Sequence, residues 1–181
     1  MRSEEICREL REAAGKRELA ETICRAVEEY TLGDLQDLRA ALVKDLQHLP
    51  PSYRSRLYPR LIEQVFGTHH RILLVCRSSG LEGIAGPLAD RFPEYCAMVE
   101  RACGSCATRE EASRDLFYYL LAAFNIFVLE IPGHPVGTPF PGGFSVEERD
   151  GEYRCPVREK EGDVETSICP FCPAKQADVT L

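Results

Sequence analysis

Residues 109–130 read REEASRDLFYYLLAAFNIFVLE, and this stretch decides the fold. Thr108 lies just before it, and Glu111 in its first turn completes a capping box, a pairing that starts many helices. From Leu116 onward, apolar side chains fall on every side of a helix with about 3.6 residues per turn. Such a helix belongs at the centre of a bundle. We expect Asn125, within it, to be a hydrogen-bonded core residue rather than a catalytic group.

Most of the preceding chain has the helical spacing of apolar residues that a surrounding bundle requires. We expect a helix from Ser3 that Gly15 ends or bends, and a second helix that follows it directly. Further helices are expected over residues 34–49 and 52–66, the latter with a kink or a later start at Pro59, and from near Pro87 or Pro93 to Gly104. The third has the clearest pattern. Its apolar side is a stripe of leucines at helical spacing: Leu35, Leu38, Leu42, Leu46 and Leu49. Gly33 is the expected end of the helix before it.

Two short segments between these helices are less regular. Residues 67–70, GTHH, interrupt the pattern and predict a turn. The apolar run at residues 72–76 fits a strand or a helix by its periodicity, and we favour a helix because its neighbours are helical. His69 and His70 are adjacent, and neighbouring residues rarely face one ion together, so neither is a favoured metal ligand.

Residues 131–143, IPGHPVGTPFPGG, contain four prolines and four glycines, which exclude both a helix and a regular strand. Two interpretations of this segment stay open. It is a rigid connector, or it is an ordered loop that delivers His134 to a metal or a substrate. We therefore divide the chain into a helical bundle at residues 1–131 and a connector with a cysteine-rich hairpin at residues 132–181, packed on the bundle.

Three cysteines near the C-terminus have the spacing of a metal or iron–sulfur site: Cys155, Cys169 and Cys172. A C-x-x-C turn points two thiolates to the same side, and the proline after each cysteine restricts the turn before any metal binds. Upstream, residues 143–146 and 153–155 flank Asp150–Gly151, a sequence that favours a two-residue hairpin turn. We expect Cys155 on the returning strand, facing the C-x-x-C turn.

A second C-x-x-C motif, Cys103 to Cys106, lies in the turn before the central helix. The two pairs could complete one four-cysteine site, which would tie the C-terminal segment to the helical body, or each pair could be separate. The fourth ligand of the C-terminal site is therefore expected to be Cys103, Cys106 or His134.

The residues from His134 to Gly143, followed by Tyr153-x-Cys155-Pro156-Val157, Cys169-x-x-Cys172 and Gln176, resemble an uncharacterised archaeal family, mostly from methanogens, known as domain of unknown function 2115. The match is specific over roughly the last fifty residues. The resemblance implies a cytoplasmic archaeal protein and directs attention to His134, Cys155, Cys169 and Cys172. It implies no activity, and it does not reach Cys96, Cys103 or Cys106.

Composition limits the partners. A net charge of −7 and a pI near 5.2 argue against nucleic acid, which requires a basic face. The longest apolar stretch is shorter than the ~20 residues of a membrane span, and the N-terminus lacks the apolar core of a signal peptide. We therefore expect a cytoplasmic protein whose nine cysteines are thiols or ligands and not disulfides, with Cys7 and Cys24 as small apolar fillers.

Three functions follow from these patterns. The first is a metal protein, with zinc as the expected cofactor and an iron–sulfur cluster as the alternative. The second is a metal-free enzyme in which one cysteine of a C-x-x-C pair is a nucleophile or redox thiol and His134 is its base. The third is an adaptor whose helical body binds an unknown protein partner. The sequence leaves open whether any reaction is catalysed.

Overall fold

A computed structural model describes residues 3–177 and gives the protein a mainly helical fold with a small sheet near the C-terminus. The helices are α1 (Ser3–Glu12), α2 (Lys16–Glu28), α3 (Leu32–Asp45), α4 (Pro51–Ile62), α5 (Thr68–Arg77), α6 (Phe92–Gly104) and α7 (Arg109–Ala123). Shorter helical segments are η1 (Leu46–His48), η2 (Glu63–Gly67), η3 (Ser79–Gly83), η4 (Phe124–Val128) and η5 (Cys169–Phe171). The strands are β1 (Glu147–Arg149), β2 (Glu152–Cys155) and β3 (Lys175–Gln176).

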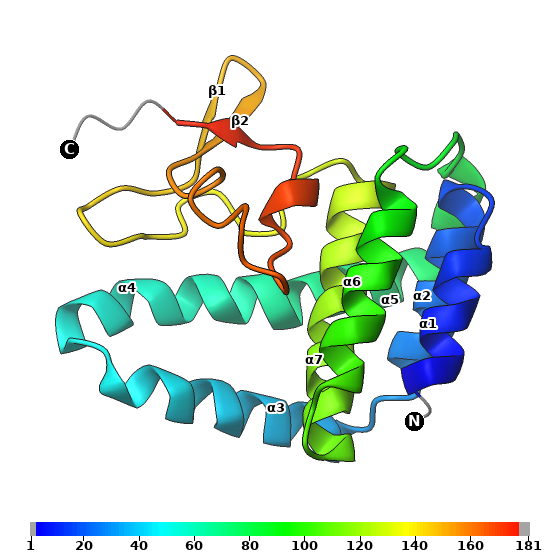
Figure 1. Ribbon diagram of the computed structural model, residues 1–181, viewed down its shortest axis with the longest axis horizontal. Helices are drawn as coiled ribbons and strands as arrows, with labels where there is room; N and C mark the ends of the chain where they lie inside the picture. Colours follow the sequence, from blue (N-terminus) through cyan, green and yellow to red (C-terminus); the bar gives the residue numbers. More distant parts are fainter. Residues whose placement is uncertain (1–2, 178–181) are drawn as a thin grey trace.

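The helices form a bundle with one protruding hairpin. Figure 1 shows α1, α2, α6 and α7 packed together, while α3 and α4 extend away from them. The C-terminal segment lies above α4 and beside α6 and α7. No helix within residues 3–177 has the length and apolar character needed to cross a membrane.

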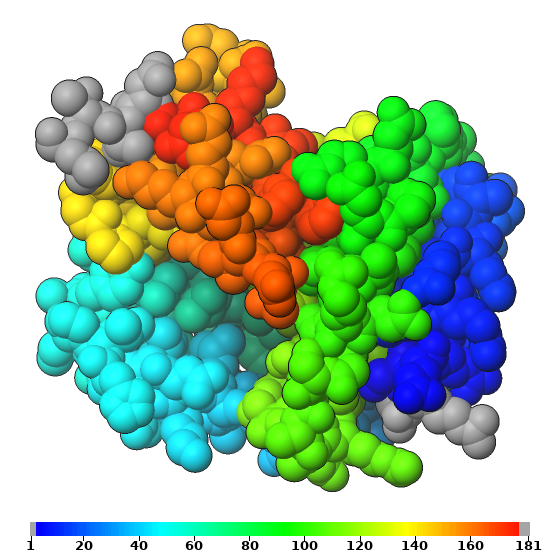
Figure 2. Space-filling model, viewed as in Figure 1, coloured from blue at the N-terminus to red at the C-terminus, as the bar shows by residue number. Residues whose placement is uncertain are grey.

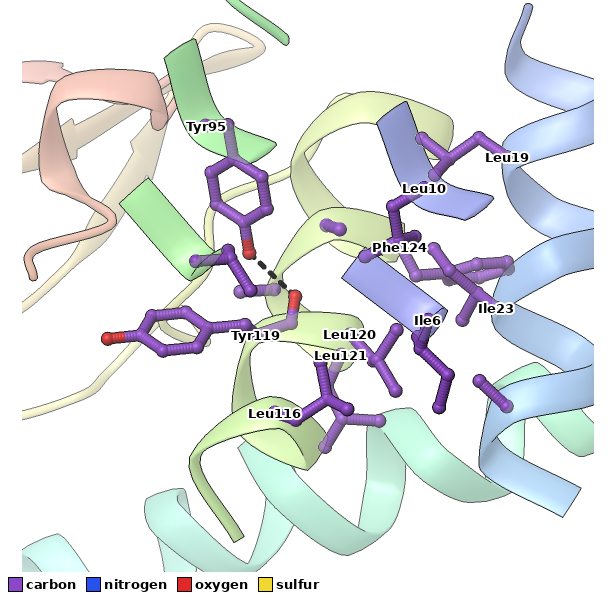
Figure 3. Close-up of a cluster of buried hydrophobic side chains, with 14 of the residues drawn as sticks. Ile6, Leu10, Leu19, Ile23, Tyr95, Leu116, Tyr119, Leu120, Leu121 and Phe124 are labelled. Carbon is purple, nitrogen blue, oxygen red and sulfur yellow. Dashed lines mark hydrogen bonds between the residues drawn. The ribbon is translucent and has the colours of Figure 1, made fainter. Parts of the chain in front are cut away.

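The predicted central helix is confirmed. Thr108 and Glu111 make both hydrogen bonds of the capping box, and α7 continues through the π-helical η4 to Val128. The chain then turns at Glu130, whose φ is 56°. Leu120 and Phe124 are fully buried, and burial of such side chains contributes about 2 kcal/mol each. Figure 3 shows the side chains that α1 and α2 direct towards them: Ile6, Leu10, Leu19 and Ile23.

The leucine stripe of residues 34–49 is only partly buried. α3 begins at Leu32, because Thr31 and Asp34 form a capping box, so Gly33 lies inside α3 instead of ending the previous helix. Within α3 no residue is buried, and of the five predicted leucines only Leu46, in η1, is buried. Figure 1 shows the reason: α3 and α4 form a hairpin that extends away from the other helices, so few elements lie near α3.

The predicted turn at residues 67–70 is wrong, whereas the predicted helix at residues 72–76 is confirmed. The backbone passes from α4 through the π-helical η2 into α5 without leaving helical geometry, and Gly67 has a φ of −64°. His69 therefore lies on a helix, where it is buried and its ring packs 5.4 Å from that of Phe117. Tertiary contacts of this kind override the local preference of glycine for turns.

The expectation of no disulfide is also wrong. Cys24 of α2 and Cys76 of α5 form a disulfide, with their Cα atoms 5.8 Å apart. α2 and α5 pack against each other, which places these residues within disulfide reach although 52 positions separate them. Cys24 is therefore a cross-link between two helices and not an apolar filler.

The C-terminal segment is a small sheet with its own apolar cluster. β1 and β2 are antiparallel, and Asp150 and Gly151 have the positive φ values, 55° and 77°, of the predicted hairpin turn. The outgoing strand is Glu147–Arg149 and not residues 143–146, although Ser145 makes an isolated bridge to Pro139. β3 pairs in parallel with β2. The tyrosine hydroxyls of Tyr53 and Tyr119 donate to the carbonyls of Pro139 and Thr166, both at 3.0 Å, and so attach the segment to the helices.

Candidate metal centre

The C-x-x-C turn is built from a single turn of 3₁₀ helix. Cys169 begins η5, Pro170 restricts its second position, and the N–H of Cys172 donates to the Cys169 carbonyl at 3.1 Å. Cys172 itself is extended, with φ of −66° and ψ of 135°, and directs the chain towards β3. Cys169 is buried and Cys172 is half-buried, so the turn has an inner and an outer thiol.

Strand pairing brings Cys155 to the same place. Cys155 ends β2 opposite Gln176 of β3, and the N–H of Ala177 donates to the Cys155 carbonyl at 3.0 Å. Cys155 is buried with Val146 and Ala174, and Cys172 packs against this cluster. Cys155 thus lies on the returning strand, as predicted, and Cys172 of the C-x-x-C turn packs against its cluster.

Hydrogen bonds converge on two of the sulfurs. The backbone N–H groups of Val157 and Arg158 donate to Cys155 Sγ. At the other cysteine, the Cys169 N–H donates to the Ser167 hydroxyl oxygen at 3.1 Å, and the Ser167 side chain lowers the pKa of Cys169. Burial raises the pKa of Cys155 and of Cys169, the neighbouring sulfurs raise them further, and these hydrogen bonds act in the opposite direction. A bound cation would favour the thiolate form of all these groups.

A second layer of contacts holds the two segments that carry the cysteines. The Gln176 side chain accepts from the N–H of Glu159 at 2.9 Å and donates to the Pro156 carbonyl at 3.0 Å, which fixes the loop after Cys155. Arg158 and Arg91 both donate to the Pro170 carbonyl, at 3.3 Å and 2.5 Å. The Arg91 guanidinium also lies over the Phe171 ring, 4.9 Å from its centroid.

The cysteines share one neighbourhood but do not yet form a coordination sphere. In the described residues 3–177, no group of three or more His, Cys, Asp or Glu side chains is arranged to hold a metal ion as it stands. Burial raises the pKa of Tyr118 of α7, Cys169 and Cys172 add to that rise, and a hydrogen bond to the Gln64 side chain acts in the opposite direction. Neither Tyr118 nor Ser167 could be found from the sequence, since no motif marks them.

The other C-x-x-C pair lies at the opposite end of α6. Arg91 immediately precedes α6 and touches the C-x-x-C turn, whereas Cys103 is twelve residues further on, about 18 Å along a helix. There Cys103 faces Cys7, and Cys106 Sγ lies 3.5 Å from an Asp115 carboxylate oxygen. The structure therefore places the two pairs in different surroundings.

His134 lies in the connector predicted for it. Its ring packs edge-on against Phe140, 6.1 Å between centroids, and burial lowers its pKa.

Next to the C-x-x-C turn, a groove of about 390 Å³ runs between one face of α6 and residues 162–171. In Figure 2 this C-terminal segment, orange to red, lies directly against α6, in green.

Comparisons with known proteins point to one family. A family model described as an uncharacterized protein conserved in archaea (DUF2115) matches residues 15–177. A UPF0305 protein of Methanocaldococcus jannaschii is 26% identical over 90% of this chain and 96% of its own length. A UPF0305 protein of Methanopyrus kandleri is 44% identical over 70% of this chain and 86% of its own length.

A UPF0305 protein of Methanothermobacter thermautotrophicus is 45% identical over 38% of this chain, and the match spans only 44% of that relative. No solved structure matches this chain significantly.

Proposed function

We propose that this chain, which belongs to the archaeal DUF2115 family, binds a metal through Cys155, Cys169 and Cys172. One observation carries the proposal. Thiols from two segments, joined by the β2–β3 pairing, converge on one neighbourhood in which backbone N–H groups already donate to Cys155 Sγ. Donors of this kind stabilise thiolates, which are the form of cysteine that binds metals.

Zinc is the expected metal, and an iron–sulfur cluster is the alternative. Both favour thiolate ligands, and zinc is commonly held by a tight turn that follows a hairpin. Cysteines lose their protons when they bind a metal, and metal binding often completes a site that is only partly formed beforehand. We therefore infer that the metal draws Cys155, Cys169 and Cys172 into coordination distance from their present arrangement.

The fourth position is open to water or a small ligand in this proposal. Cys103 and Cys106 lie at the other end of α6, and the ring of His134 packs against Phe140. A zinc ion with an open position can act as a Lewis acid, whereas a closed site is structural.

A cytoplasmic location belongs to the same proposal, because thiol ligands persist in a reducing compartment. The Cys24–Cys76 disulfide would have to be protected from reductants there. Burial offers partial protection, since Cys24 is 6% exposed and Cys76 is half-buried.

Metal content tests the proposal. The wild type and Cys169→Ser would be purified without oxygen and analysed for metals, acid-labile sulfide and visible absorption. Cys96→Ser is the matched control, because Cys96 is a buried cysteine of α6 that is not among the proposed ligands. We expect about one zinc per chain in the wild type and the control, and a loss in Cys169→Ser. Iron with labile sulfide would select the cluster, and metal-free protein throughout would refute the proposal.

A further inference from the structure

A second group of thiols lies where α1 packs against α6. The two helices are antiparallel: Arg11 of α1 pairs with Glu100 of α6, and one turn away Cys7 faces Cys103. A side-chain hydrogen bond joins Cys7 and Cys103, and it lowers the pKa of Cys7 and raises that of Cys103. Cys7 is 2% exposed and Cys103 is 7% exposed. The pair is therefore enclosed in the core.

Helix geometry places this pair within disulfide reach. Packed helices have axes about 8–10 Å apart, and each Cα lies about 2.3 Å from its axis, so directly facing residues have Cα atoms about 3.4–5.4 Å apart. Disulfides span about 4.4–6.8 Å between Cα atoms. In the same helical body, α2 and α5 already carry the Cys24–Cys76 disulfide at 5.8 Å.

Cys106 connects the buried pair to the surface. It follows Cys103 in the C-x-x-C motif, and its N–H donates to the Cys103 carbonyl at 3.4 Å, so the two thiols are joined by one tight turn. Cys106 is half-buried, whereas Cys7 and Cys103 are buried. A dissolved reagent thus reaches Cys106 before the other two.

We propose that Cys7, Cys103 and Cys106 form a thiol–disulfide exchange site that takes low-molecular-weight disulfides, separate from the metal centre. The Cys106 thiolate attacks a disulfide RSSR, forms a mixed disulfide and releases RS⁻. Cys103, after losing its proton, attacks Cys106 Sγ, forms the Cys103–Cys106 disulfide and releases the second RS⁻. Cys7 then attacks Cys103 Sγ and frees the Cys106 thiolate. The protein is oxidised by two electrons, and RSSR is reduced to two RSH, with the two protons supplied by Cys7 and Cys103.

The rate of the first step is limited by the surroundings of Cys106. Burial and the Asp115 carboxylate raise the pKa of Cys106, so little thiolate is present at neutral pH. We therefore expect slow exchange, over minutes to hours, which ends at a disulfide between two buried residues.

The test is exchange with 2-hydroxyethyl disulfide on the full-length, metal-loaded protein without oxygen, followed by peptide mapping under non-reducing conditions. The wild type should yield a cross-link between the peptides of Cys7 and Cys103, with two equivalents of 2-mercaptoethanol released for each cross-link. Cys106→Ser should form this cross-link at least tenfold more slowly. Cys7→Ser, or Cys7→Ala if the serine variant misfolds, should stop at Cys103–Cys106.

Cys96→Ser is the control, because Cys96 is buried on the same helix outside the proposed sequence of reactions. Its rate should equal that of the wild type. A wild-type product in which Cys7 stays a free thiol would overturn the proposal. An unchanged rate in Cys106→Ser would also overturn it.

Discussion

Replacing Gln176 by alanine should weaken metal binding without removing a ligand. The Gln176 side chain makes hydrogen bonds to the Glu159 N–H at 2.9 Å and the Pro156 carbonyl at 3.0 Å, and these fix the loop that donates N–H groups to Cys155. Each bond contributes about 1 kcal/mol net, so their joint loss is about 2 kcal/mol. If the metal must restore that order, its dissociation constant rises about 30-fold.

Competition with a chromophoric zinc chelator measures this change. The dissociation constants of the wild type, Gln176→Ala and Gln36→Ala would be compared at one pH. Gln36 is the matched control, because it is an exposed glutamine on α3, outside the C-terminal segment. A constant for Gln176→Ala within threefold of the wild type, in a folded protein, would refute the claim that this loop prepares the site.

Three further predictions concern stability. Replacing Cys24 and Cys76 together by alanine should lower the free energy of unfolding by about 4 kcal/mol, which is the loop-closure entropy for a separation of 52 residues. A decrease of less than about 1 kcal/mol in urea unfolding would contradict this. Burial lowers the pKa of His69 below 6.5, so on acidification the unfolded chain binds a proton at this residue more readily than the folded protein does. The free energy of unfolding should therefore fall as the pH drops below 6.5, and it should fall less in His69→Gln. Tyr95→Phe removes the buried 2.6 Å hydrogen bond from the Tyr95 hydroxyl to the Tyr119 carbonyl and should lower the free energy of unfolding by about 1 kcal/mol. An unchanged midpoint of thermal unfolding would show instead that water replaces this hydrogen bond.

The sequence predicted those parts of the fold that depend on neighbouring residues. An apolar surface on every side of residues 116–128 required a central position, and α7 with η4 has it. The Thr108–Glu111 capping box and the Asp150–Gly151 turn are equally local, because their hydrogen bonds and dihedral angles involve only a few consecutive positions. The approach of Cys155 to the C-x-x-C turn followed from the hairpin alone.

The features that the sequence did not reveal depend on contacts between distant segments. The Cys24–Cys76 disulfide arises from the packing of α2 on α5, which no spacing encodes. β3 has two residues, too few for a periodic pattern, and it exists because it pairs with β2. The helical path through Gly67 was hidden for the same reason, since burial of His69 against Phe117 outweighs the local signal.

Counting the sulfur ligands around the bound metal is the most direct test of the central claim. X-ray absorption spectroscopy at the zinc edge would be recorded on protein purified without oxygen. The proposed site predicts three sulfur atoms at about 2.3 Å and one lighter atom at about 2.0–2.2 Å. Four sulfurs would bring Cys103 or Cys106 into the site and contradict the separation of the two C-x-x-C pairs. A first shell without sulfur would contradict the metal centre itself.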